Sequence, residues 1–237
     1  MSLYPTEQWL EAFGHALDRS RRLDTIASGW GVGFDGDVML VIDDIPLAET
    51  TLGDLPDSVL ADLPENIRAG VSDVSLAAAP ERFGETLRPS LPANVQDLLY
   101  QIETKVHDGT IYAYVGLEEG RCTGTEVLDD PTEKDVGYVV KGPYQTWRRI
   151  VDGRPVTSAW LNGDLVIEGN KVRLLRHGSV LQVVGDVAAD VETTHLFPGE
   201  AATPGELVLD EAVRQPIAVG LLAEQQASLV TNTLSPF

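Results

Sequence analysis

Four histidines and one cysteine are the side chains of this sequence best suited to catalysis or metal binding, and their spacing supports neither. His15, His107, His177 and His195 are never three or four residues apart, so no helix can present two of them to one metal ion. Cys122 has no second cysteine for a disulfide, which fits a reducing compartment, and we expect it to pack as a small apolar side chain. The sequence therefore predicts no metal site, with the histidines at the surface or at helix caps.

Other motifs of catalysis are absent or weak. The run GWGVG at residues 29–33 looks like a dinucleotide-binding loop, but it leads into a turn and a strand rather than a helix. His177, Ser179 and Asp186 are separated by two and seven residues, which does not place all three on one face of a helix. There is no Gly-x-Ser-x-Gly, Walker or Cys-x-x-Cys motif. We expect no catalytic residue and no cofactor.

The charge is strongly acidic but unevenly distributed. The net charge is −20, from 17 Lys and Arg against 37 Asp and Glu, and lysine is much rarer than arginine. This composition is typical of a protein from a salt-loving organism, where salt screens the repulsion, although an ordinary acidic protein is the alternative. Residues 141–185 are the exception, with a net charge of +4. Nucleic-acid binding is not expected, because most of the surface would repel phosphate.

We expect a cytoplasmic protein. No apolar run approaches the roughly 18 residues that span a membrane. The first residues, MSLYPTEQWLEAF, are acidic and amphipathic rather than typical of a signal peptide.

The first half of the chain predicts a helix, a hairpin and a helical insertion. Apolar residues at helical spacing predict a helix over 5–27. An Asp-Gly turn between apolar runs predicts strands at 30–34 and 38–42. Six prolines divide residues 43–108 into short pieces, the best of which is a helix at 94–106. We interpret 43–108 as a helical insertion or lid.

The second half predicts strands followed by helices whose ends carry Pro or Gly. The predicted strands are 110–117, 121–128, 136–141 and 165–167, and the predicted helices are 144–152, 156–161, 171–190 (interrupted near Gly178) and 217–230. Residues 198–205 are predicted to be a loop. The domain is thus expected to cover 1–197, with 198–237 as a C-terminal loop and helical extension.

The second half of the chain resembles a known protein family. The order of a strand, GPYQTWRRIVDG, RPVTSAWLNGDLVIEGN and a helix resembles the sterol carrier protein type 2 family, in a haloarchaeal-like form. The family's strand motif corresponds to GDLVIEG at 163–169, and its helical aromatic position corresponds to Trp147. The resemblance covers about 110–190 well and the N-terminal helix and hairpin loosely. Residues 43–108 and 198–237 depart from the family pattern.

The resemblance implies an α+β fold. About five mostly antiparallel strands would form a sheet covered on one face by helices, with an apolar lipid tunnel between the two layers. The residues support this fold in part, because the two apolar helices predicted at 144–152 and 156–161 must each bury one face on the sheet. Whether they fill the core or leave a dry cavity stays open. The expected lipid-binding residues are Trp147, Ile150, Val151, Val156, Ala159, Trp160, Leu165, Ile167, Leu174 and Leu181.

The basic segment suggests how a ligand's head group would be held. We expect Arg148, Arg149 or Arg176 to meet a lipid carboxylate or phosphate, the alternative being that these side chains neutralise nearby acidic ones. The predicted function is non-enzymatic carriage of an isoprenoid, fatty acyl or sterol-like lipid. One alternative is a structural or dimerisation module with a filled core. The other alternative is a small hydrolase. Transient membrane contact and homodimerisation are left open.

Overall fold

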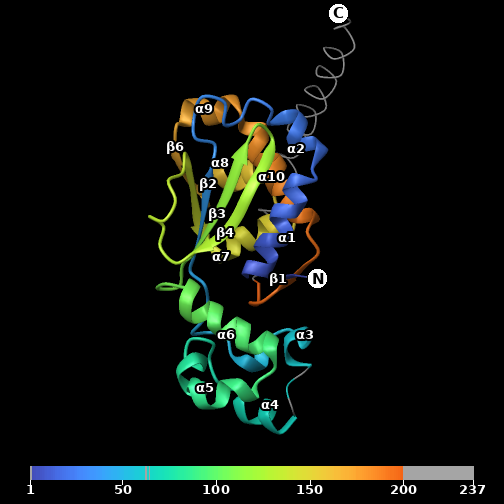
Figure 1. Ribbon diagram of the computed structural model, residues 1–237, viewed down its shortest axis with the longest axis vertical. Coiled ribbons are helices and arrows are strands. Elements are labelled where there is room, and N and C mark those ends of the chain that lie inside the picture. Colours follow the sequence, from blue (N-terminus) through green and yellow to red (C-terminus); the bar gives the residue numbers. More distant parts are fainter. Residues whose placement is uncertain (1, 62, 64, 200–237) are drawn as a thin grey trace, which may run out of the picture.

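The computed structural model describes residues 2–61, 63 and 65–199, and it has two lobes (Figure 1). The upper lobe holds a five-stranded sheet in the order β4-β3-β2-β5-β6. The central β2 pairs in parallel with β5, and the other neighbours are antiparallel. The strands are β2 (Val38–Asp43), β3 (Ile111–Glu118), β4 (Arg121–Leu128), β5 (Tyr138–Pro143) and β6 (Val166–Gly169). The α+β fold with a mostly antiparallel five-stranded sheet is confirmed.

The helices of the upper lobe bury their apolar sides against this sheet and one another. Contacts join α1 to β4 and α10, and α7 to β2, β5 and α10. These helices are α1 (Glu7–Asp18), α2 (Arg21–Ile26), α7 (Tyr144–Val151), α8 (Val156–Leu161), α9 (Lys171–Arg176) and α10 (Gly178–Asp190). Among the described residues, the opposite face of the sheet carries only a small buried cluster around Met39, Val41 and Leu128. The main core therefore lies between the helices and one face of the sheet.

Local sequence signals explain the ends of these helices. Thr6 caps α1 by accepting a hydrogen bond from the Trp9 backbone N–H, and Asn170 caps α9 in the same way. Pro143 and Pro155 precede α7 and α8 as expected, since proline suits a helix start. Gly153 follows α7 with a φ of 100°, a conformation that favours glycine.

An ion pair joins the α7–α8 corner to the turn before β6. The Arg154 side chain is only 3% exposed and donates to an oxygen of the half-exposed Asp164 carboxylate at 2.7 Å. The pair therefore links the two ends of α8.

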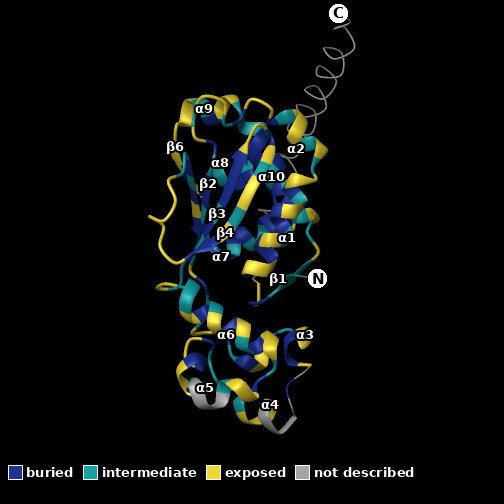
Figure 2. Ribbon diagram, in the orientation of Figure 1, coloured by how far each residue is buried: buried dark blue, intermediate teal, exposed yellow. Residues whose placement is uncertain are grey.

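The lower lobe consists of the residues between β2 and β3. It contains the 3₁₀ helices η1 (Leu52–Asp54) and η2 (Arg88–Ser90) and the helices α3 (Asp57–Leu60), α4 (Glu65–Val71), α5 (Ala79–Leu87) and α6 (Ala93–Lys105). Figure 2 shows that this lobe has its own buried residues, which include Leu52, Leu76, Leu91, Val95 and Leu99. Its role as a lid stays a prediction.

Two further short strands join residues 2–4 to residues 193–195. β1 (Ser2–Tyr4) pairs in parallel with β7 (Thr193–His195), so that Tyr4 lies opposite His195. The sequence analysis did not predict either strand.

Several predicted elements were wrong in detail. Residues 30–34 form turns rather than a strand, because Gly31 and Gly33 adopt φ values of 83° and 72°. The fifth strand of the sheet is therefore β6. The helix predicted over 5–27 is two helices, α1 and α2, and α5 was not predicted. The interruption predicted near Gly178 is confirmed, because α9 ends at Arg176 and α10 begins at Gly178.

The predicted loop at 198–205 lies mostly, and the predicted helix at 217–230 entirely, outside the described residues. No helix in the described part of the chain has the length and apolar character needed to cross a membrane.

Gly14 tests the contact of α1 with the sheet. A Cβ at this position would lie 2.7 Å from Thr125 Oγ1 and 2.8 Å from Thr125 Cγ2, and Thr125 is held by a hydrogen bond to the Leu10 carbonyl. We expect Gly14→Ala to lower the free energy of unfolding by about 1–3 kcal/mol, measured by urea denaturation.

The matched control is Gly70→Ala in the exposed end of α4, where an added Cβ meets nothing within 4 Å. Alanine should leave stability unchanged there or raise it by about 0.5–1 kcal/mol. Equal stability of the two alanine variants would contradict the close approach of α1 to β4.

Candidate functional site

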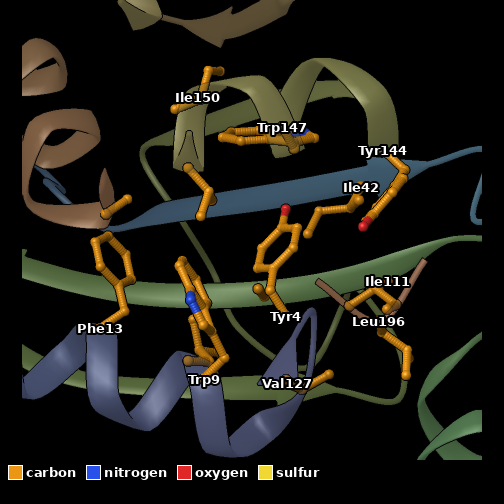
Figure 3. Close-up of a cluster of buried hydrophobic side chains, with 14 of the residues drawn as sticks. Tyr4, Trp9, Phe13, Ile42, Ile111, Val127, Tyr144, Trp147, Ile150 and Leu196 are labelled. Atoms are coloured by element: carbon orange, nitrogen blue, oxygen red, sulfur yellow. The ribbon is translucent and has the colours of Figure 1, made fainter. Parts of the chain in front are cut away.

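An apolar cavity of about 60 Å³ lies between the sheet and the helices. Figure 3 shows side chains of the sheet and of the helices converging on this region. Trp9 and Phe13 of α1 lie on one side, and Trp147 and Ile150 of α7 lie on the other. The lining residues are Tyr4, Pro5, Thr6, Trp9, Leu10, Phe13, Val38, Leu40, Ile42, Ile111, Ala113, Val115, Leu117, Val127, Val140, Trp147, Ile150, Val151, Val156, Leu181, Val184, Gly185 and Ala188.

Strand periodicity supplies the floor of the cavity. Alternate residues of β2 line it, namely Val38, Leu40 and Ile42. β3 contributes in the same way, from Ile111 to Leu117. Because successive side chains of a strand point to opposite faces, these residues all face the helices.

Helical periodicity supplies the walls. On α10, Leu181, Val184, Gly185 and Ala188 recur at intervals of three or four residues and share one face. Gly185 lets α10 approach closely, since a Cβ there would lie 2.3 Å from Val156 Cγ2. The shape of this wall therefore depends on Gly185, because a side chain at this position would force the neighbouring atoms to move.

Only four lining residues carry a polar side-chain atom, and three of these atoms are already bonded within the protein. Trp147 Nε1 donates to the Val41 carbonyl at 3.0 Å. Trp9 Nε1 donates to Thr193 Oγ1 at 2.7 Å. Thr6 Oγ1 donates to the Leu3 carbonyl at 2.5 Å. The fourth group is the hydroxyl of Tyr4, so the cavity offers a ligand almost only apolar surface.

A polar cluster lies next to the Tyr4 end of the cavity. His195 Nε2 lies 2.6 Å from an Asp152 carboxylate oxygen, and the Tyr144 hydroxyl donates to the Phe197 carbonyl at 3.4 Å. Burial raises the pKa of Tyr4 well above its ordinary value, and the nearby Tyr144 and Asp152 raise it further. Burial also raises the pKa of Tyr144. Both phenols are therefore neutral at physiological pH.

The structure places the ten predicted lipid-binding residues in two groups. Trp147, Ile150, Val151, Val156 and Leu181 line the cavity. The other five do not, because they lie around α8, α9 and β6, where side chains fill the core: Ala159, Leu165, Ile167 and Leu174 are buried, and Trp160 packs against them half-buried. Lipid binding itself stays a prediction for the first group.

None of the three predicted head-group arginines lines the cavity. Arg148 donates to the Phe197 carbonyl at 3.4 Å and lies 3.8 Å from an Asp152 carboxylate oxygen, close to the Tyr4 end. Arg149 is half-buried on the same helix, and Arg176 is exposed at the end of α9. Of the three, Arg148 is the one placed to meet a group at that end.

Sequence reasoning missed the N-terminal contribution to the cavity. Trp9 and Phe13 are among the apolar residues whose spacing predicted a helix over 5–27, but neither they nor Tyr4 were predicted to bind a ligand. The helical spacing of Trp9 and Phe13 was a usable signal, whereas the position of Tyr4 depends on the pairing of β1 with β7.

A second hollow separates the two lobes. This cleft has a volume of about 900 Å³ and lies between α1 and β4 on one side and α3 and α6 on the other. Three residues, Thr6, Leu10 and Val127, line both the cleft and the apolar cavity. The wall between cleft and cavity is therefore a single layer of side chains at this place.

Polar contacts join the lower lobe to the upper lobe next to this wall. Lys105 Nζ of α6 donates to the Val127 carbonyl at 3.0 Å and pairs with an Asp129 carboxylate at 2.7 Å. The hydrogen bond to Asp129 raises the pKa of Lys105. The Glu7 backbone N–H donates to Gln101 Oε1 at 3.0 Å.

The residues considered for catalysis are not brought together. His177 makes ring contacts with Trp30 and Phe34, whereas Asp186 binds Arg22 at 2.8 Å. Within residues 2–61, 63 and 65–199, no group of three or more His, Cys, Asp or Glu side chains could hold a metal ion. Burial raises the pKa of the Cys122 thiol, which makes it less reactive.

Comparison with protein-family models and with curated proteins finds no match. Two solved structures are similar. One is a conserved hypothetical protein of Thermus thermophilus, described as possibly a sterol carrier protein, with 18% identity, a TM-score of 0.46, and coverage of 80% of this chain and 90% of that one. The other is sterol carrier protein 2, with 18% identity, a TM-score of 0.46, and coverage of 78% and 97%. A likeness of this extent leaves the function of this chain to be inferred from its own residues.

The buried phenols predict how stability changes at high pH. Because the pKa values of Tyr4 and Tyr144 are raised in the folded state, the unfolded chain loses these protons first as the pH rises above the ordinary value of about 10. The free energy of unfolding should then fall by up to about 1.4 kcal/mol per pH unit for each tyrosine. Urea denaturation at pH 9, 10 and 11 measures this slope.

Tyr144→Phe isolates the contribution of one phenol and should make the fall shallower than in the wild type. An identical slope in the variant and the wild type would contradict the burial of the Tyr144 hydroxyl.

Proposed function

We propose that this protein binds and carries an apolar lipid between its sheet and its helices, without transforming it. The observation that supports the proposal is the cavity lining, which is apolar except for one hydroxyl, with the remaining polar side-chain atoms bonded inside the protein. Such a site gains affinity by removing hydrocarbon from water, at about 0.8 kcal/mol for each buried methylene group. Isoprenoid, fatty acyl and sterol-like lipids all contain hydrocarbon that could be buried in this way.

Binding requires the cavity to expand. Its volume of about 60 Å³ is far below the roughly 300–1,000 Å³ of ordinary ligand pockets, so in this proposal the structure corresponds to a closed form. A lipid would have to part the helices from the sheet, and the free energy of burying its chain would offset that cost.

We place the access route at the cleft between the lobes. Thr6, Leu10 and Val127 form the thin wall there, and the helical lobe covers it through Lys105 and Gln101. In this proposal the lobe between β2 and β3 is the lid. Opening it would break these polar contacts and would uncover apolar side chains of α6, such as Leu98 and Ile102, which belong to the same core cluster as Val127.

The small cavity volume also favours a second candidate, a structural or dimerisation module with a filled core and no ligand. In that case the cavity is a packing defect of the kind that most domains contain. α9 would then offer a surface for association, since Val172 is 74% and Leu175 70% exposed. The same surface would mediate membrane contact in a carrier, because Lys171 and Arg176 flank it.

Cytoplasmic location and adaptation to high salt belong to the same proposal. The net charge of −20 supports salt adaptation, because salt screens repulsion between acidic surface groups.

Ala188→Leu tests the carrier proposal. This buried residue of α10 lines the cavity, and a larger side chain would fill the space that the ligand needs. The wild-type protein, incubated with dodecanol or an isoprenoid alcohol, should show a bound lipid mass by native mass spectrometry. The variant should lose at least about tenfold in affinity, equivalent to ~1.4 kcal/mol.

The control is Ala69→Leu, which makes the same change on an exposed residue of α4. It should bind lipid as the wild type does, and circular dichroism should show that both variants are folded. A wild-type protein that takes up no lipid would favour the filled-core module, and equal binding by Ala188→Leu would place the ligand elsewhere.

A further inference from the structure

The hydroxyl of Tyr4 stands out in the cavity because the surrounding side chains are apolar. Tyr4 is 2% exposed and lines the cavity at the end of β1. Figure 3 shows its ring between Trp9 and Ile42, with the oxygen directed toward Trp147. The hydroxyl is therefore buried among hydrocarbon rather than directed to the surface.

The ring that carries this hydroxyl is held on several sides. The Trp9 ring meets it edge-on with centroids 4.7 Å apart, and the Tyr144 ring stacks against it at 5.9 Å. His195 contacts it edge-on at 6.0 Å. The Leu196 backbone N–H donates to the Tyr4 carbonyl at 2.9 Å, which fixes the backbone as well. The direction of the hydroxyl is thus set before any ligand binds.

No hydrogen bond joins this hydroxyl to another described residue, unlike the other three polar side chains of the lining, and it borders the cavity rather than being fully enclosed like the unbonded Tyr138 hydroxyl. Buried polar groups are nearly always bonded, and an unmet one destabilises a fold. Phenylalanine would fill the same space without that cost. A tyrosine here is therefore explained most simply by a partner that arrives with the ligand.

The surroundings select the kind of group that can be that partner. Burial keeps the phenol neutral, so it offers one donor and two acceptor positions but no charge. A lipid carboxylate would have to lose its hydration among apolar side chains, and Arg148, the arginine at this end, is already paired with Asp152 and bonded to the Phe197 carbonyl. A neutral oxygen avoids the cost of burying a charge.

We propose that Tyr4 is the polar anchor of the site and that its hydroxyl binds the hydroxyl or carbonyl oxygen of a neutral lipid, such as a long-chain alcohol. This inference rests on the proposed function and names its ligand class. The oxygen lies near Tyr4 at the end of the cavity formed by the paired residues Ile42 and Ile111. The hydrocarbon chain extends past Phe13 toward the pair Val38 and Val115.

The test compares 1-dodecanol with dodecane, which differ only by the hydroxyl group. Binding to the full chain is measured by native mass spectrometry and by the tryptophan fluorescence of the cavity-lining Trp9 and Trp147. The wild type should bind dodecanol about five- to tenfold more tightly than dodecane, as one buried hydrogen bond allows. Tyr4→Phe should abolish that preference and leave dodecane binding unchanged.

Tyr144→Phe is the matched control, because it removes a phenol that stacks on Tyr4 but does not line the cavity. It should keep the preference for dodecanol. The unliganded Tyr4→Phe protein should melt at the same temperature as the wild type or higher, since it loses an unpartnered buried hydroxyl.

Each outcome separates the two proposals. If the wild type binds neither compound, the carrier proposal fails and the anchor fails with it. If the wild type binds both compounds equally, or if Tyr4→Phe keeps the preference for dodecanol, the carrier proposal stands and the anchor is wrong. If Tyr4→Phe does not fold, equal binding of the two compounds by the wild type still overturns the anchor, because that comparison requires no variant.

Discussion

The contact between the apolar face of β2 and β3 and the helices that cover it is the interaction on which the rest of this structure depends. Strand periodicity turns Val38, Ile42, Ala113 and Val115 to one side, and hydrocarbon on that side must be covered. The covering helices come from both ends of the described chain, with α1 before β2, α7 and α8 between β5 and β6, and α10 after β6. The same burial that stabilises the fold therefore encloses the cavity, and a ligand would take the place of contacts between the two layers.

The energetics of the site follow from its chemistry. An apolar lining gives affinity without direction, so lipids of similar length and width should compete for it. Direction has to come from polar groups, and the described lining offers a single unbonded one, on Tyr4. Arg148 and the pair of Asp152 with His195 lie just beyond that end of the cavity. They set the charge near the site. Arg148 donates to the Phe197 carbonyl and Asp152 pairs with His195 Nε2, whereas His195 Nδ1 is buried without a hydrogen-bond partner. Specificity in this account is therefore a preference for neutral over charged head groups.

Much of the fold could be predicted from the sequence, because its signals are local. Pro143 and Pro155 before helices, and the Gly and Asn residues after them, predicted the α7–α8 region, and strand periodicity predicted β2 to β5. The strand predicted at residues 30–34 was wrong because the alternation around glycines was interpreted as a strand, whereas Gly31 and Gly33 adopt positive φ values that form turns. The site was harder to predict. Its lining depends on where helices stand off the sheet, and Tyr4 reaches it only through a three-residue strand paired with residues near the other end of the described chain. Neither feature leaves a periodic pattern.

The central claim is that a lipid lies between the helices and the sheet. Isotope-filtered NMR of the protein with unlabelled 1-dodecanol tests it most directly, since nuclear Overhauser effects report only protons that lie close together in space. The account predicts effects from the dodecyl chain to the methyl groups of Val38, Val115 and Leu181 and to the Trp147 indole, all of which line the cavity. Effects confined to the inter-lobe cleft, or to the exposed Val172 and Leu175 of α9, would contradict it.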